Sequence, residues 1–312
     1  MDYDSKLSFL ERLLGKYKYS NSTKEAEFFC CFCSHHKQKL SINIETDHWQ
    51  CWVCGKAGKS LIYLIKKVGS REDIEDYLKK YKSNNINIFI DKEAISQFHL
   101  NLPEEFRPIV ECKDSIAGRK AYDYLTRVRK IEEKDILRHK IGLAIAGDYQ
   151  NRIIFPSFNK EGFINYFTTR GYEGGYVSPT VPKGYRSQII PNELNIDWTK
   201  PVVLVEGYVD MLKSIPNTIP LFGKSIMEHW VLFEKIVMSD IPIFLALDQD
   251  AKKSSHKISE LFMSSDVLVY NIDISPYKDV GEMSKEEFKN RYECAIPVSR
   301  NSIFREKLRM LC

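Results

Sequence analysis

The sequence predicts a mixed α/β protein, α+β overall, in which a small cysteine-rich domain precedes a larger core built around a parallel sheet. Three observations predict this. Five of the eight cysteines lie between positions 30 and 54. A polar, asparagine-rich stretch, KSNNINIFIDKEAISQ, then separates two parts of different pattern. After Pro201, near-continuous apolar strands alternate with helical segments, which is typical of a parallel sheet covered on both faces.

The composition is that of a folded protein with sizeable cores: 312 residues, 43% hydrophobic, with a formal net charge of +4. This charge is too small to indicate nucleic-acid binding by itself. Lysines and arginines do cluster at 37–67 and 119–130, either as a binding surface or as solvated helix faces. Apolar runs fall far short of the roughly 20 residues of a membrane span, and the N-terminus lacks signal-peptide features. We therefore expect a cytoplasmic protein with no membrane partner.

The periodicities divide the chain into four parts. Residues 1–82 begin with the amphipathic pattern LSFLERLLG, carry the clustered cysteines, and end with the helical periods SLIYLIKKVG and EDIEDYLKKY. Residues 83–102 form a linker. Residues 103–200 combine the helical segments SIAGRKAYDYLTRVRK and EEKDILRHK with the strands IGLAIAG, RIIFPSF and FINYFTTR. In 201–312, strands and helices alternate from PVVLVEG to the helix SKEEFKNRYE.

Two cysteine pairs have the spacing of a zinc ribbon. Cys30 and Cys33 form one C-x2-C pair and Cys51 and Cys54 form another, with seventeen residues between the pairs. Such clustering does not suit a disulfide framework, which spreads its pairs through a secreted domain. We therefore expect four thiolates around one structural Zn²⁺. Because protein ligands fill all four positions, the site is expected to be closed and not catalytic.

Other ligand sets are open at this stage. Cys33 and His36 stand at C-x2-H spacing, so a Cys3His site built on His36 is an alternative. Cys31 could take the place of Cys30. Four buried thiols without any metal are the remaining interpretation.

Carboxylates stand at the ends of the strands in the last part of the chain. Glu206 follows the strand VVLV, and Asp248 and Asp250 follow IPIFLAL. Asp279 comes after a further strand. The carboxyl ends of parallel strands lie at one edge of a sheet, so these acids can converge there, where their hard oxygens suit Mg²⁺ or Mn²⁺ and phosphoryl transfer. Solvated acidic turns and helix caps are the alternative interpretation.

The order of the motifs resembles that of bacterial and bacteriophage-type (DnaG-like) DNA primases. A strand followed by Glu-Gly and a later strand followed by Asp-x-Asp is the toprim pattern. An N-terminal ribbon of the form CxxC…CxxC-G-x-x-G precedes it here. The segments NRIIFPSFNKEGFINYFTTRG and VPKGYRSQ resemble the primase polymerase core, and VVLVEGYVDMLK, LFGKSI, FLALDQDAKKS and YKDVGEM follow in order. The resemblance extends to about residue 290.

The resemblance implies an N-terminal zinc ribbon joined to a primase catalytic core that contains a toprim parallel α/β sheet. It implies that 1–82 is a DNA-binding domain, that 103–200 is the N-terminal part of the polymerase core, and that 201–312 holds the toprim subdomain and C-terminal helices. It also implies that Glu206 and the Asp248/Asp250 pair hold the catalytic metals, Mg²⁺ or Mn²⁺. Asp279 is a secondary magnesium ligand.

The resemblance further implies a basic channel for nucleotides or template. Arg152, Arg170 and Lys183 are expected to line it, and Lys224 in LFGKSI is a secondary candidate for substrate binding. The segment around Lys183 departs from the family's Pro-Lys-Tyr because Gly184 intervenes.

The function that the resemblance implies is a DNA primase, a nucleotidyltransferase that makes short RNA primers on single-stranded DNA for replication. The expected partners are a single-stranded DNA template and ribonucleoside triphosphates. A separate replicative helicase is also expected, since a chain ending at 312 leaves no room for a fused one. The location is the cytoplasm, that of the host if the chain is phage-encoded. Trp49 or Trp52 could stack on template bases, or could belong to the ribbon core.

Two other functions use the same features. A toprim nuclease would hydrolyse phosphodiesters with the same metals. A non-catalytic adaptor would only bind single-stranded DNA through its zinc domain. The products made from single-stranded DNA, ribonucleotides and Mg²⁺ distinguish the three.

Overall fold

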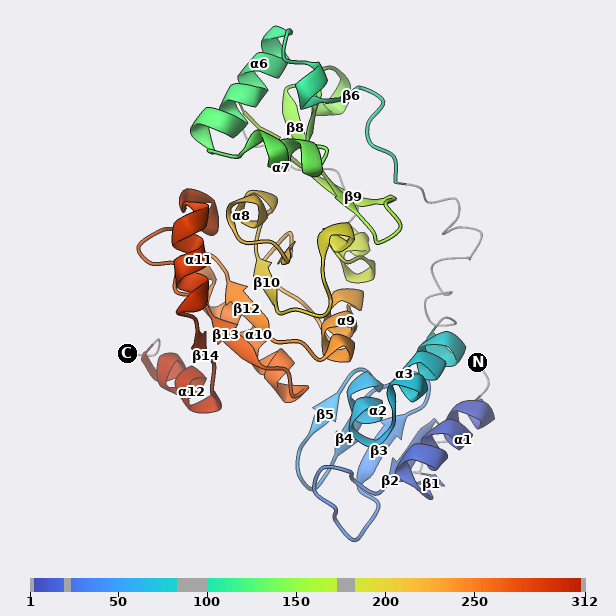
Figure 1. Ribbon diagram of the computed structural model, residues 1–312. Coiled ribbons are helices and arrows are strands. Elements are labelled where there is room, and N and C mark those ends of the chain that lie inside the picture. The colour runs from blue at the N-terminus through green and yellow to red at the C-terminus, as the bar shows by residue number, and fades with distance from the viewer. Residues whose placement is uncertain (1–2, 20–23, 83–99, 173–182, 310–312) are drawn as a thin grey trace. The chain divides into compact units, whose positions relative to one another are not determined.

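The computed structural model describes residues 3–19, 24–82, 100–172 and 183–309. The chain forms two compact units (Figure 1). One comprises Met1–Phe98 and Phe233–Met238, and the other comprises His99–Leu232 and Ser239–Cys312. Most of the predicted linker, residues 83–99, lies outside the described residues.

Within its described residues up to Lys82, the first unit is a five-stranded antiparallel sheet with three α-helices; its separate segment Phe233–Met238 belongs to the helix α9 (Val231–Ser239). The strands follow one another in the order β1-β2-β3-β4-β5. Short connections between consecutive strands favour this antiparallel meander. The elements are α1 (Tyr3–Leu14), β1 (Lys18–Tyr19), β2 (Glu25–Phe28), β3 (Leu40–Asn43), β4 (Trp49–Cys51), β5 (Ala57–Gly58), α2 (Ile62–Val68), α3 (Arg71–Tyr77) and the π-helical turn η1 (Leu78–Lys82).

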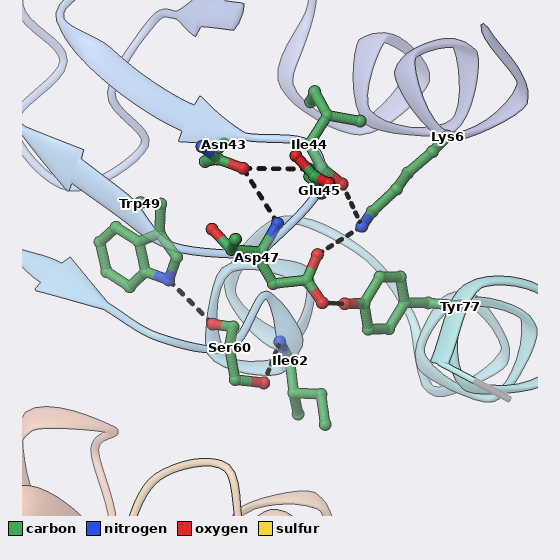
Figure 2. A network of polar contacts seen from close by, with 10 residues as sticks. Lys6, Asn43, Ile44, Glu45, Asp47, Trp49, Ser60, Ile62 and Tyr77 are labelled. Carbon is green, nitrogen blue, oxygen red and sulfur yellow. Dashed lines mark hydrogen bonds and ion pairs between the residues drawn. The ribbon is translucent and has the colours of Figure 1, made fainter. Parts of the chain in front are cut away.

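A buried polar network ties two helices of this unit to the turn between β3 and β4 (Figure 2). Lys6 of α1 is fully buried; its Nζ donates to Ile44 O at 2.7 Å and forms an ion pair with Asp47. The hydroxyl of Tyr77, on α3, donates to the other oxygen of Asp47. A buried lysine is tolerated only when it is paired and hydrogen-bonded, so this contact fixes how α1 and α3 meet the hairpin.

The second unit begins with a four-stranded antiparallel sheet in the order β6-β7-β8-β9. All seven residues of β8 are buried, and β8 pairs with β9 along its whole length. The elements are β6 (Phe106–Pro108), η2 (Ile109–Glu111), α6 (Ile116–Asp123), η3 (Tyr124–Val128), α7 (Glu133–Arg138), β7 (Gly142–Ala144), η4 (Gly147–Tyr149), β8 (Arg152–Phe158), β9 (Ile164–Gly171), η5 (Lys183–Gln188) and η6 (Glu193–Asn195).

The predicted parallel sheet follows and is confirmed. Its order is β11-β10-β12-β13-β14, with the first four strands parallel and β14 antiparallel (Figure 1). The elements are β10 (Val202–Val205), α8 (Tyr208–Lys213), β11 (Thr218–Pro220), α9 (Val231–Ser239), β12 (Ile243–Ala246), η7 (Gln249–Ala251), α10 (Lys252–Ser264), β13 (Val269–Asn271), η8 (Val280–Glu282), α11 (Lys285–Glu293), β14 (Ile296–Pro297) and α12 (Arg300–Arg309).

The two sheets of the second unit share one hydrophobic core. Ile153 and Phe155 of β8 pack in the same cluster as Val203 and Val205 of β10. The hydroxyl of Tyr208, at the start of α8, donates to Pro156 O at 2.6 Å and joins α8 to β8. The mixed α/β fold class, α+β overall, is therefore confirmed. Among the described helices, none combines the length and apolar character needed to cross a bilayer.

Candidate functional site

Four cysteine sulfurs come together in the first unit. The Sγ atoms of Cys30, Cys33, Cys51 and Cys54 all lie within 4.8 Å of one another. The Cys30–Cys54 and Cys33–Cys51 sulfur pairs are each 3.8 Å apart. Thiolates bound tetrahedrally at about 2.3 Å from one Zn²⁺ are separated by about 3.8 Å. The cluster therefore fits a structural zinc ion with four protein ligands.

The two C-x2-C pairs form matching turns. Ser34 follows the first pair with φ 49° and Gly55 follows the second with φ 72°. The Ser34 amide donates to Cys30 O and the Gly55 amide donates to Cys51 O, both at 3.0 Å. The left-handed residue turns the chain sharply after each pair, so both cysteines of a pair face the same point.

The alternative ligands lie outside this group. Within the described part of the chain, one group of three or more residues brings sulfur or imidazole ligand atoms together within 4.8 Å, and it consists of the four cysteines named above. Cys31 is half-buried and is not among them. The ring of His36 instead packs against His35, with 4.3 Å between centroids. The geometry favours Cys30 and Cys33 over the sets built on Cys31 or His36.

Residues 1–82, which contain the four cysteines and are called the zinc unit below, have two tryptophans that differ in exposure. Trp49 is buried, its Nε1 donates to Ser60 O at 2.8 Å, and its ring stacks on Phe32. Trp52 lies between the cysteines of the second pair and is 66% exposed. Trp49 therefore belongs to the core, whereas Trp52 presents an aromatic face to solvent.

Three carboxylates meet at the carboxyl ends of β10 and β12. These strands are adjacent and parallel, with Val205 opposite Ala246, so the residues that follow them are neighbours. The Asp248 amide donates to Glu206 Oε1 at 3.1 Å. Carboxylate oxygens of Glu206, Asp248 and Asp250 all lie within 4.8 Å of one another. This brings together the three acids expected to bind the catalytic metals.

Negative charges are crowded in the partly buried carboxylate cluster, and the Lys224 ammonium offsets part of their repulsion. Burial raises the pKa of Glu206. Burial, followed by the charge of Glu206, raises the pKa of Asp248 to about 7. Crowded carboxylates that are partly removed from water favour a bound cation, and their hard oxygens suit Mg²⁺ or Mn²⁺. The donor set thus fits a divalent cation.

Asp210 is a further acid that the sequence argument did not single out. It lies in the first turn of α8, four residues after Glu206, and is only 8% exposed. Its carboxylate accepts from the Gly207 amide at 2.8 Å and from the Gly281 amide at 2.9 Å. Burial and then the charge of Asp279 raise its pKa. The spacing E-G-x-x-D could have identified Asp210 from the sequence, because it puts Glu206 and Asp210 at the start of the same helix.

Asp279 lies close to the cluster but outside the group of three. It precedes η8, and its Oδ1 accepts from the Glu282 amide at 3.0 Å. Its charge contributes to the raised pKa values of Asp210 and Asp248. Asp279 therefore adds to the negative potential at this edge of the sheet.

The predicted basic residues occupy different environments. Arg170 is exposed near the end of β9, and its charge acts to lower the pKa of Asp210. Arg152 is only 7% exposed, and its Nε donates to Thr169 Oγ1 at 2.8 Å. Lys224 Nζ is 2.5 Å from Asp250 Oδ1. Lys183 begins η5, and its side chain lies outside the described atoms. Lys224 thus contacts the acids, Arg170 is near enough for its charge to act on Asp210, and Arg152 joins two strands.

Sequence comparison finds relatives with this arrangement of motifs. No protein-family profile matches the chain. It is 20% identical to the DNA primase of Staphylococcus aureus strain COL over 336 residues, which covers 87% of this chain and 56% of the relative. The primase of strain N315 matches at 20% identity, with 87% and 55% covered. The sequence relatives of this chain are DNA primases. The chain spans just over half the length of these primases.

Solved primase structures also match. The DnaG primase catalytic domain bound to single-stranded DNA aligns with a TM-score of 0.50 and 16% identity, covering 60% of this chain and 75% of that one. The zinc-binding and RNA polymerase domains of the Aquifex aeolicus primase align over 95% of this chain and 86% of that one, with a TM-score of 0.46 and 15% identity. The DnaG match supports a primase-like catalytic fold, and the predicted resemblance to DnaG-type primases is confirmed.

Proposed function

We propose that this chain is a DNA primase, which synthesises short RNA primers on single-stranded DNA from ribonucleoside triphosphates. One observation carries the proposal: Glu206, Asp248 and Asp250 converge at the ends of adjacent parallel strands in a chain whose relatives are primases. Phosphoryl-transfer sites use such an edge of a sheet to place a divalent cation against phosphate oxygens.

The carboxylates hold the reacting groups in place. They would do so by binding a divalent cation, which would supply charge neutralisation during phosphoryl transfer. The chain's own part is to fix the ligands: the Asp248 amide holds Glu206, and Asp210 ties the start of α8 to η8 through Gly207 and Gly281. No covalent nucleophile is needed, because the primer 3′-hydroxyl attacks the α-phosphate of the incoming ribonucleotide directly. The new phosphodiester bond forms as the bond between the α- and β-phosphates breaks, pyrophosphate leaves, and the hydroxyl proton passes to solvent.

Basic residues bind the triphosphate and the template in this proposal. Arg170, whose charge acts on Asp210, and Lys224, which pairs with Asp250, are proposed to contact phosphate oxygens. Lys183 is proposed for the same channel. Arg152 acts on this channel by holding β8 against β9 through Thr169. Arginine and lysine are suited to this task because they form charge-assisted hydrogen bonds to phosphate.

The zinc unit, residues 1–82, is proposed as the template-binding domain, joined through 83–102 to the polymerase core at 103–200 and the toprim subdomain at 201–312. Zinc supplies no chemistry here; it holds the two cysteine turns together. The exposed ring of Trp52 supports this role, because an aromatic face stacks on the unpaired bases of single strands. We further propose a separate replicative helicase as partner and the cytoplasm, of the host if phage-encoded, as location.

The decisive experiment offers the protein single-stranded DNA, labelled ribonucleotides and Mg²⁺. Short RNA products that depend on the template support the proposal. Shortened DNA without any RNA indicates a nuclease, and zinc-dependent DNA binding without either product indicates an adaptor. Glu206→Gln and Asp248→Asn are expected to abolish RNA synthesis. The matched control is Glu286→Gln, an exposed acid on α11 far from the cluster in sequence, which should retain it.

A further inference from the structure

The turn that follows β11 is clamped from several sides. Phe222 and Gly223 both have positive φ, at 53° and 153°. Arg186, on η5, donates from Nη1 to the Phe222 carbonyl, and its guanidinium lies 5.7 Å from the Trp230 ring centroid. The Phe222 ring stacks on Tyr166 at 4.9 Å. The backbone and the side chain of Phe222 are thus both held.

Only glycine fits next to this clamp. A Cβ on Gly223 would lie 2.4 Å from Arg186 Nη1, and the positive φ would strain any other residue. Arg186 can therefore approach the turn this closely because residue 223 is a glycine. The next residue after this fixed turn is Lys224, so the clamp sets where the Lys224 side chain begins.

Lys224 reaches from the clamped turn into the carboxylate cluster. Its Nζ is 2.5 Å from Asp250 Oδ1 and 3.9 Å from Glu206 Oε2. These two acids are members of the group that fits a divalent cation. An ammonium at this position pairs with Asp250 and lies near Glu206, two of the carboxylates that would hold a metal ion, so the two positive charges compete for them.

We propose that Lys224, positioned by Arg186, is a tethered cation that occupies the Asp250 side of the metal site and weakens divalent-cation binding there. When a divalent ion takes Asp250 and Glu206, the Lys224 ammonium is released and can contact a substrate phosphate. This proposal deepens the metal site of the proposed function and rests on that site, but its test does not require primer synthesis.

The test measures Mn²⁺ affinity in the absence of nucleotide and DNA, by electron paramagnetic resonance or calorimetry. Lys224→Met removes the competing charge and is expected to bind Mn²⁺ at least about fivefold more tightly than the unaltered chain. The matched control is Lys289→Met on α11, which removes one exposed positive charge away from the cluster and should change the affinity little. Unchanged or weaker binding by Lys224→Met overturns the proposal.

A second variant tests the clamp. Arg186→Met is expected to release the turn and, like Lys224→Met, to raise the affinity for Mn²⁺. The double variant of Arg186→Met and Lys224→Met should bind Mn²⁺ no more tightly than Lys224→Met alone. Arg186→Lys, which keeps a donor for the Phe222 carbonyl, should restore part of the competition. Fully additive effects of the two substitutions contradict a positioning role for Arg186.

Failure of this inference and failure of the proposed function are distinguishable. Absence of RNA products from the unaltered protein removes the primase assignment and leaves the Mn²⁺ comparison intact. Equal Mn²⁺ affinities of the unaltered protein and Lys224→Met remove the inference and leave primer synthesis intact.

Discussion

At the scale of single residues, Asp47 is the centre of the buried polar network in the zinc unit. It is the partner of fully buried Lys6 and of Tyr77. Asp47→Ala leaves the Lys6 ammonium buried without its counter-ion, and breaking such a pair costs about 3–5 kcal/mol of unfolding free energy. Tyr77→Phe removes one hydrogen bond only, at about 1 kcal/mol. Urea unfolding of the zinc-loaded protein, followed by tryptophan fluorescence, measures both.

The control for Asp47 is an exposed ion pair in the same unit. Glu45 pairs with Lys24 at 2.7 Å, and both side chains are largely in water. Glu45→Ala should change the unfolding free energy by less than about 1 kcal/mol, because exposed ion pairs contribute little. Equal losses from Asp47→Ala and Glu45→Ala contradict the importance given to the buried network.

Asp248 illustrates a conflict between its proposed function and stability. Its pKa is raised to about 7 by burial, followed by the Glu206 charge. The folded chain therefore binds this proton more tightly than the unfolded chain, whose aspartate titrates near pH 4. The stability of the metal-free protein falls as the pH rises from about 4 to 7, and the whole loss is present above pH 7.

Asp248→Asn should consequently stabilise the metal-free protein at pH 8 by about 1 kcal/mol or more, a rise of roughly 2–4 °C in Tm. The same variant should gain little at pH 4, where the native aspartic acid is already neutral. Thermal unfolding at the two pH values, with chelator present, measures this. A lower Tm at pH 8 for the variant contradicts the argument. Asp250→Asn is the comparison, because Asp250 is exposed and paired with Lys224.

Trp52 is the residue expected to contact template bases directly. Stacking on an aromatic side chain contributes about 1–3 kcal/mol per base, so Trp52→Ala should weaken single-stranded DNA binding by roughly 5- to 150-fold. Fluorescence anisotropy with a labelled oligonucleotide measures the affinity, and Trp52→Phe should retain part of it. Since Trp52 is 66% exposed, the zinc unit should remain folded in both variants. Unaltered affinity of Trp52→Ala would remove this residue from the interface.

At the scale of elements, the features predicted correctly from the sequence are local. Each C-x2-C pair spans four residues, and Glu206 and Asp248 directly follow short apolar strands. Such short patterns can be recognised in the sequence without knowledge of the fold. Arg186 was missed because its partner, the Phe222 carbonyl, lies 36 residues away along the chain. Asp210 has a local partner in Gly207, but its contact with Gly281, 71 residues away, could not be read from the sequence. The roles of Trp49 and Trp52 stayed open for the same reason, since burial is decided by packing.

Gly118 gives an element-scale prediction in which packing overrides helix propensity. It lies in α6, where alanine would normally stabilise the helix by about 1 kcal/mol. A Cβ here would lie 1.9 Å from the Cys112 carbonyl oxygen, which belongs to the backbone and cannot easily move. Gly118→Ala should therefore destabilise the second unit, by about 1–3 kcal/mol. Arg127→Ala, an exposed substitution in η3, is the comparison in the same unfolding experiment and should be nearly neutral.

At the scale of the whole molecule, the chain separates two metal chemistries into two compact units. The four sulfurs lie in the first unit and the three carboxylates in the second, each with its own core. Structural zinc stabilises the unit that contains its four cysteine ligands. The carboxylate site instead depends on the register between β10 and β12. Loss of one metal should therefore leave the other site formed.

Cys51→Ser tests this separation. The variant should lose zinc and single-stranded DNA affinity, because the ribbon is no longer held at both cysteine turns, while Mn²⁺ binding at the carboxylates stays within about twofold of the unaltered protein. Cys31→Ser is the matched control: it removes a neighbouring thiol outside the group of four, so zinc should be retained. Metal analysis, oligonucleotide anisotropy and Mn²⁺ titration on the same samples measure the three quantities. Parallel loss of DNA binding and Mn²⁺ binding in Cys51→Ser would mean that the zinc unit also shapes the carboxylate site, and the two roles could then no longer be separated.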